Sequence, residues 1–162
     1  MVQKLAVIDS TITTLAAPLP SADGAESSLK VDGLGALWTR PVQVAAELTL
    51  FASAARTTTV NTEVTNTQYR GVIVVFDWTV EAATSTLTLH IEGKSTLGSN
   101  WYTMLSSAAL TAIGTTVYRV YPGAIASANL IADDWLPPTW RFRVAVGDAD
   151  SSTYSANAIL LP

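Results

Sequence analysis

The side chains that could do chemistry in this 162-residue chain are few, and His90 is the only histidine among them. One histidine cannot build a multi-histidine metal site, and the chain has no His-Glu-x-x-His motif. As a general base, His90 would need a nucleophile and an orienting acid, and no motif marks either. It falls on the outward side of an expected strand, so we predict a surface or structural role for it.

Two acidic pairs lie in expected loops. Asp148 and Asp150 belong to the segment Gly-Asp-Ala-Asp-Ser-Ser-Thr, which offers the oxygen ligands that calcium takes but lacks the full calcium-binding loop with its distal glutamate. Asp133 and Asp134 precede Trp135, and this group could bind a cation or a sugar. We interpret both pairs as polar loops, the second with an aromatic anchor.

The sequence also lacks the residues that other classes of enzyme need. A glycosidase needs two carboxylates about 5 to 9 Å apart across a cleft. Asp77 and Glu81 share one face of an expected strand, where four residues of separation correspond to about 13 Å. Motifs of serine hydrolases and of nucleotide-binding loops are missing, and without cysteine the chain has no thiol nucleophile, disulfide or thiolate metal site. We therefore expect no enzymatic activity, no metal and no cofactor.

Five tryptophans and five tyrosines raise the question of a sugar-binding platform. Trp78 and Trp140 sit on apolar faces of expected strands and are most simply core residues. Trp38, Trp101 and Trp135 occupy arm or loop positions, where they could stack on sugars or anchor a protein interface. We favour the interface and keep the sugar platform as the alternative.

Composition narrows the possible partners. The net charge is −4, and the nine basic residues are scattered, so we expect no nucleic-acid partner. Charged residues make up 14% of the chain, well below the usual quarter, and a surface so short of charge suits burial against partners. No stretch has the length of a membrane span or the form of a signal peptide, so we expect no membrane partner and a protein made in the cytoplasm.

The elements that must position these residues are strands. In residues 71–93, apolar side chains alternate with others, as in a strand with one buried face; they are Val72, Val74, Phe76, Trp78, Val80, Leu87, Leu89 and Ile91. Ile73 and Val75 are apolar as well, so the first of these strands should begin buried on both faces. A short polar link between the two strands predicts an antiparallel hairpin.

The simplest register of this hairpin pairs Val80 with Leu87 and leaves residues 82–85 as its loop. Asp77 then falls opposite His90 on the solvent-exposed side of the hairpin. A carboxylate beside an imidazolium favours the charged form, so this register predicts a raised pKa for His90.

Further short strands are expected at 48–51, 60–64, 101–105, 117–121, 140–146 and 154–161, separated by turns at hairpin spacing. Seven or eight strands without an amphipathic helix predict an all-β fold, an antiparallel β-sandwich or jelly roll, over residues 47–162.

Residues 1–46 differ, because prolines and glycines interrupt any helix or long strand. We interpret them as an extended N-terminal arm. Its apolar residues need cover from the chain's own domain, a neighbouring subunit or a partner. A loosely packed strand pair of the same domain is the alternative. The residues expected to contact a partner are Leu34, Leu37, Trp38, Arg40 and Val42.

Several segments resemble virion structural proteins of tailed bacteriophages. Residues 32–41, Asp-Gly-Leu-Gly-Ala-Leu-Trp-Thr-Arg-Pro, look like a short arm seen in such proteins. Segments of the β domain are similar as well: 54–57, 69–72, 101–105, 118–123 and 153–156. The resemblance covers most of residues 32–161 and brings no catalytic residue with it.

The resemblance implies a capsid decoration, or cement, protein located on the capsid surface of a virion. Its implied partners are the major capsid protein and further copies of itself, most simply as a homotrimer. A carbohydrate-binding or host-attachment module and a tail component are the alternatives.

Overall fold

A computed structural model of the protein describes residues 30–31, 37–38, 44–81 and 84–162. The chain divides into two compact units, residues 1–42 and residues 43–162. In the first unit, β1 (Lys30–Val31) pairs antiparallel with β2 (Leu37–Trp38). The remainder of the predicted arm up to residue 43 lies outside the described residues.

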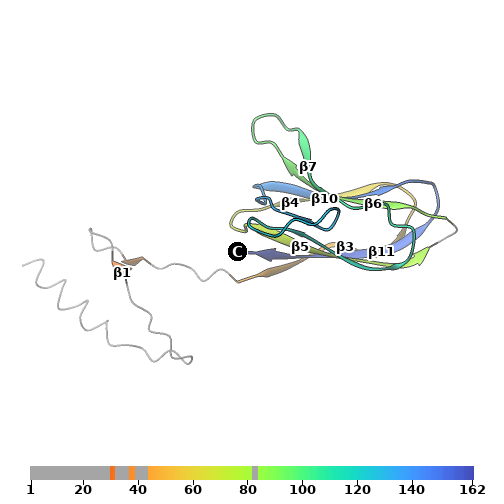
Figure 1. The fold of residues 1–162 in the computed structure, drawn as a ribbon, viewed down its shortest axis with the longest axis horizontal. Helices are drawn as coiled ribbons and strands as arrows, with labels where there is room; N and C mark the ends of the chain where they lie inside the picture. Colours follow the sequence, from red (N-terminus) through yellow and green to blue (C-terminus); the bar gives the residue numbers. More distant parts are fainter. Residues whose placement is uncertain (1–29, 32–36, 39–43, 82–83) are drawn as a thin grey trace, which may run out of the picture. The chain divides into compact units, whose positions relative to one another are not determined.

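The second unit is a sandwich of two β-sheets, drawn as two layers in Figure 1. The four-stranded sheet has the order β4 (Val60–Thr65), β10 (Thr139–Val146), β6 (Leu87–Lys94), β7 (Trp101–Ser106). The five-stranded sheet has the order β3 (Ala46–Arg56), β11 (Ser152–Leu161), β5 (Gly71–Glu81), β8 (Gly114–Val120), β9 (Ile131–Ala132). The strands pair antiparallel except that β8 and β9 run parallel. The predicted all-β sandwich is confirmed, with the short β9 as an additional strand.

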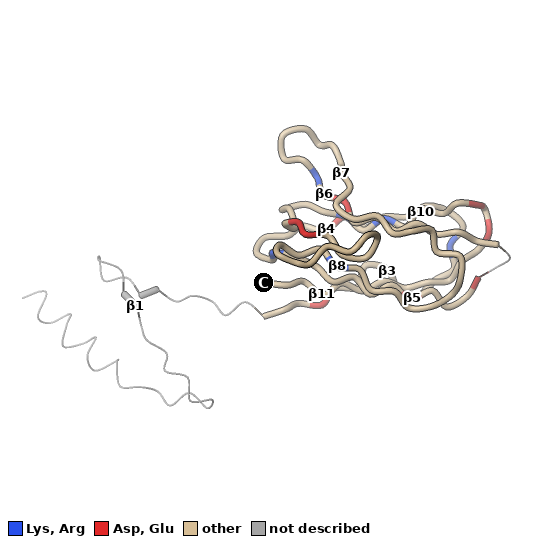
Figure 2. Tube along the Cα trace, viewed as in Figure 1, with Lys and Arg blue, Asp and Glu red and all other residues tan. Residues whose placement is uncertain are grey.

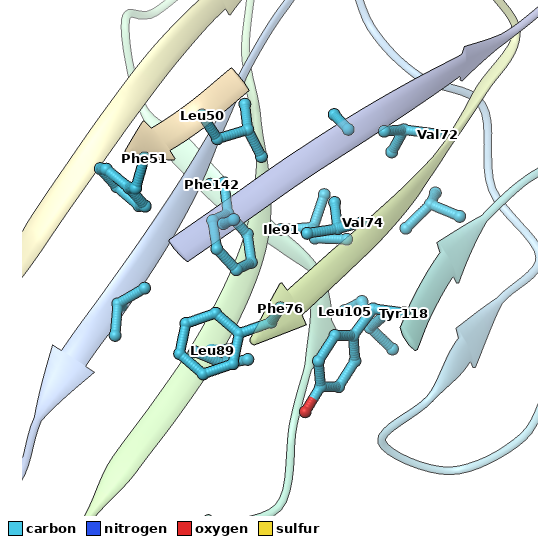
Figure 3. Close-up of a cluster of buried hydrophobic side chains, with 14 of the residues drawn as sticks. Leu50, Phe51, Val72, Val74, Phe76, Leu89, Ile91, Leu105, Tyr118 and Phe142 are labelled. Atoms are coloured by element: carbon cyan, nitrogen blue, oxygen red, sulfur yellow. The ribbon is translucent and has the colours of Figure 1, made fainter. Parts of the chain in front are cut away.

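The core lies between the sheets and is built from the alternating residues of both (Figure 3). Phe76 from the five-stranded sheet and Phe142 from the four-stranded sheet are fully buried. Tyr154 packs against Phe76 with their ring centroids 5.1 Å apart, and Phe51 packs against Phe142 at 6.0 Å. The tryptophans predicted for the core, Trp78 and Trp140, are buried as well.

The predicted hairpin of residues 71–93 is wrong, because its two strands belong to different sheets. β5 pairs with β11 and β8, while β6 pairs with β10 and β7. The chain therefore crosses from one sheet to the other between Glu81 and Leu87. An arch across the core buries the same alternating side chains as a hairpin would, so the pattern alone could not separate the two. Trp78 and Leu89 face the core as predicted, whereas Val80 is exposed.

The first strand of the sandwich, β3, is longer than the sequence pattern indicated. It continues past the predicted end at residue 51 to Arg56, with an irregular register opposite Ala156. The Arg56 guanidinium donates hydrogen bonds to the carbonyl oxygens of Ala52, Ala54 and Tyr154 at 2.8–3.0 Å. It also lies 4.6 Å from the Tyr154 ring centroid. One side chain thus satisfies backbone acceptors where the ladder is irregular.

Candidate interaction surface

His90 lies on β6 between Arg143 of β10 and Ser106 of β7. Its predicted partner Asp77 is in the other sheet, where its carboxylate accepts a hydrogen bond of 2.7 Å from the Thr115 hydroxyl. The predicted surface pair is therefore wrong, and so is the raised pKa. Burial lowers the pKa of His90, and the positive charge of Arg143 lowers it further. Both errors follow from the hairpin register on which the pairing rested.

Glu92, which sequence reasoning had not singled out, is the most buried acid of the four-stranded sheet's outward side. Its side chain is 7% exposed and accepts hydrogen bonds from Arg141 Nε at 2.5 Å and from Arg143 Nη2 at 3.0 Å. Burial alone would raise the pKa of Glu92, but the hydrogen bonds from Arg143 and Arg141 hold that pKa below its ordinary value. Trp101 covers this network, because the Arg141 guanidinium lies 4.2 Å from its ring centroid. The charges here are satisfied within the chain.

Three of the four carboxylates in the two acidic pairs accept hydrogen bonds from backbone N–H groups in or beside their loops. Asp148 accepts hydrogen bonds from the backbone N–H groups of Thr86 and Asp150. Asp133 accepts one from Gly123 N–H, and Asp134 accepts one from the N–H of the next residue, Trp135. Among the described residues, no group of three or more histidine and acidic side chains is arranged to hold a metal ion. The carboxylates of Asp148, Asp133 and Asp134 therefore have structural roles in their loops.

Two tryptophans outside the core whose side chains the structure describes, Trp101 and Trp135, lie against basic side chains. Trp101 is partly buried and lies near both Arg141 and Lys94. Trp135 is 58% exposed, with the Arg70 guanidinium 4.5 Å from its ring centroid. Trp38 belongs to β2, and its side chain lies outside what the structure describes. Trp135 is therefore the described tryptophan with the most open surface.

The outward side of the five-stranded sheet is unusually apolar. We call it the outer face and define it by Ile73, Val75, Val117 and Ile159. An antiparallel sheet with one solvated side normally alternates hydrophobic and polar residues, so that its outward positions are polar. Here Ile73, Val75 and Ile159 are only partly buried, and Val117 is 47% exposed. The sequence did signal part of this face, since Ile73 and Val75 were expected to need cover on the second side of their strand.

Two features shape the outer face. A shallow hollow of about 300 Å³ lies over β3, β11 and β5, with Thr49, Val75 and Asn157 in its lining. The charged residues Glu47 on β3 and Arg119 on β8 flank the apolar centre, and both are exposed. Figure 2 shows how thinly charged residues are spread over the domain. The apolar centre of the outer face therefore has opposite charges on its two sides, and Asp77 lies further along β5 on the same side of the sheet.

Single apolar side chains are also exposed on loops. Leu97 is 99% exposed in the β6–β7 connection, which stands out from the body of the sandwich in Figure 1. Ile125 is 91% exposed in the segment between β8 and β9. Isolated exposed apolar residues are common on protein surfaces, so these two carry less weight than the continuous outer face.

The residues predicted to contact a partner fall in the first unit of the chain. Leu37 and Trp38 form β2. Leu34, Arg40 and Val42 lie outside the described residues, and their role stays a prediction.

The described part of the chain contains no helix long and apolar enough to cross a membrane.

Together, fold and surface define a β-sandwich domain with an apolar outer face on its five-stranded sheet. No protein-family model matches the chain, and no curated protein matches it. Among solved structures, the crystal structure of PBSX exported protein XepA has a similar fold, with a TM-score of 0.47 and 17% sequence identity. The match covers 85% of the present chain and 49% of that one, so this chain spans about half the length of that protein.

Proposed function

We propose that this protein is a structural virion protein that decorates and cements a phage capsid by binding the lattice of the major capsid protein. The observation that carries the proposal is the outer face. Ile73, Val75 and Ile159 form an apolar band that is partly exposed to water. Binding of another protein surface would remove this apolar area from water, which is favourable. The resemblance of most of residues 32–161 to virion proteins of tailed phages indicates that the assembly in question is a phage particle.

In this proposal, the two units of the chain have different roles. The sandwich supplies a rigid body whose core aromatic residues come from both sheets. The first unit supplies the residues for attachment, namely the apolar or aromatic Leu34, Leu37, Trp38 and Val42 and the basic Arg40. Tryptophan and arginine are frequent among the residues that dominate binding energy at interfaces. In this scheme the chain acts as a homo-oligomer on the capsid surface, without enzymatic activity and without nucleic acid or membrane as partner.

Binding to capsids tests the proposal directly. Purified full-length protein is mixed with assembled capsids that lack it, and co-sedimentation is measured. We expect saturable binding at a fixed number of copies per capsid and a higher melting temperature of the decorated shell. Trp38→Ala should weaken binding, while Trp135→Ala, which removes an equally large side chain from the sandwich, serves as the matched control. Absence of co-sedimentation with capsids of the cognate phage would overturn the proposal.

A carbohydrate-binding or host-attachment role is the second candidate, and the exposure of Trp135 favours it. An indole with one face on Arg70 keeps its other face for stacking on a sugar ring, and the Asp133–Asp134 carboxylates lie in the same loop. A glycan array in which wild-type protein gives clear signals and Trp135→Ala does not would favour this role over cementing. A tail component would bind purified tails instead of capsids.

A further inference from the structure

We propose that the outer face binds the same face of a second copy of this chain, about a two-fold axis parallel to the strands. This inference deepens the proposed function by naming the occupant of the face. It rests on the proposed function only for the premise that protein covers the face, and it can be tested without a capsid.

The strand register places four residues of the outer face in one row across the sheet. Ile159 of β11 lies beside Glu47 of β3 on one side and Ile73 of β5 on the other. Ile73 in turn lies beside Arg119 of β8. One row across the sheet therefore reads Glu47, Ile159, Ile73, Arg119. At the usual strand spacing the row is about 14 Å long, with an acid at one end and a base at the other.

A two-fold axis can run parallel to β11 and β5, midway between these strands and between the two copies. It places this row of one copy opposite the same row of the other copy, in reverse order. Glu47 of one copy then faces Arg119 of the other, and Ile159 faces Ile73. Each dimer contains this pairing twice, which is the self-complementarity that a two-fold interface requires. The relation aligns the strands of the two copies, and aligned sheets pack face to face about 10 Å apart.

The next row supports the same arrangement. It reads Thr49, Asn157, Val75, Val117 across β3, β11, β5 and β8. Reversal by the axis places the exposed Val117 of one copy opposite Thr49 of the other. Thr49 lines the hollow of about 300 Å³ on the outer face. A protruding side chain thus meets a depression, and the match occurs twice per dimer.

The charges favour a second copy over another occupant. Within the described residues, neither Glu47 nor Arg119 has an ion-pair partner, in contrast to Glu92, Arg141 and Arg143 on the opposite side of the sandwich. They lie at opposite ends of the row, too far apart to pair within one chain. A copy of the same face supplies both missing charges at the required places.

Charge exchange tests this geometry in the full-length chain. Association is measured by sedimentation velocity over a range of concentrations, and folding of each variant is checked by far-UV circular dichroism. Glu47→Arg and Arg119→Glu should each weaken association about tenfold, since each replaces two attractive pairs by two repulsive ones. The double variant Glu47→Arg/Arg119→Glu should return to within about threefold of wild type, because both intersubunit pairs are restored with reversed sign.

A substitution at the centre supplies the second test. Ile73→Lys should make the protein monomeric, whereas Leu97→Ser, which removes an exposed apolar side chain from a loop, should leave association unchanged. The proposal is overturned by a wild-type protein that stays monomeric, by trimers that the face variants do not alter, or by a double variant as weak as the singles. A monomer that Ile73→Lys strongly destabilises would instead assign the face to the chain's own N-terminal segment.

The same variants separate this inference from the proposed function. Loss of dimers with capsid co-sedimentation retained would leave cementing intact while confirming the interface. Normal dimers without capsid binding would refute cementing and leave the interface standing.

Discussion

Replacement of Glu92 by glutamine should destabilise the sandwich far more than the same change at Glu63. Both glutamates lie on the outward side of the four-stranded sheet and both form salt bridges, but the Glu92 side chain is 7% exposed and that of Glu63 is 49% exposed. Removal of one partner from a buried ion pair costs about 3–5 kcal/mol, because the other charge is left uncompensated. Arg141 and Arg143 still reach water, at 20% and 26% exposure, so leaving them unpaired should cost somewhat less than this range. We expect a loss of about 2–3 kcal/mol for Glu92→Gln, against about 0.2–1 kcal/mol for Glu63→Gln, which breaks an exposed pair with Lys94.

Urea unfolding at neutral pH, followed by tryptophan fluorescence, measures the two free energies of unfolding under identical conditions. Equal losses for both variants, or a loss below about 1 kcal/mol for Glu92→Gln, would show that burial does not set the strength of this network.

The pH dependence gives a second readout. The pKa of Glu92 is lowered in the folded protein, so its contribution to stability is fully present above its unfolded pKa of about 4.5 and is lost as the pH falls through the folded value. Wild type should therefore lose stability more steeply in acid than Glu92→Gln, which has no carboxylate to protonate at this position. Parallel curves for the two proteins below pH 4.5 would contradict the assignment.

Three further changes test other parts of the sandwich. Gly93→Ala should lower the free energy of unfolding by about 1–3 kcal/mol, because the new Cβ would meet the Tyr102 ring and, at 2.9 Å, the Pro137 ring. Thermal unfolding measures this loss. Gly98→Ala, where the atom nearest to the new Cβ is 3.4 Å away, is the control. Tyr154→Phe should be neutral or slightly stabilising in urea unfolding, since the buried Tyr154 hydroxyl has no hydrogen-bond partner among the described residues. Burial raises the pKa of Tyr154 to about 12, so an ultraviolet titration of wild type should show one tyrosine ionising later than the others, and its loss in Tyr154→Phe identifies it. Arg56→Lys should lose about 1–2 kcal/mol in the same unfolding assay, because an ammonium cannot reproduce the planar contacts to three carbonyls and an aromatic ring.

The sequence alone predicted which side of each strand is buried, but it did not predict which strands pair with each other. Alternation in residues 71–81 and 87–94 placed Phe76, Trp78, Leu89 and Ile91 in the core, because burial of apolar area depends only on which side of a strand a residue occupies. Whether the two strands are neighbours depends on the path of the short link between them, and both paths bury the same residues. The error at His90 arose entirely from this ambiguity.

The candidate surface could be anticipated only in part. Ile73 and Val75 already stood out as apolar on the wrong side of a half-solvated strand. Their alignment with Ile159 and with the flanking charges of Glu47 and Arg119 depends on pairing between strands far apart in the chain, which no local pattern encodes. Glu92 was overlooked for the same reason, because its burial depends on Arg141 and Arg143 of β10, which lie 49 and 51 residues later.

The position of β11 has a consequence for synthesis. This strand is the last of the nine to be made, yet it lies between β3 and β5 and pairs with both. Until residues 152–161 have emerged from the ribosome, β3 has no neighbour in its sheet, and the outer face lacks the strand that carries Ile159. Completion of the sheet requires contact between β3 and a strand about a hundred residues later, a closure that is entropically costly and slow. Chains that stop short of β11 should therefore be unable to complete the five-stranded sheet, and the sandwich should fold only after its last strand has been made.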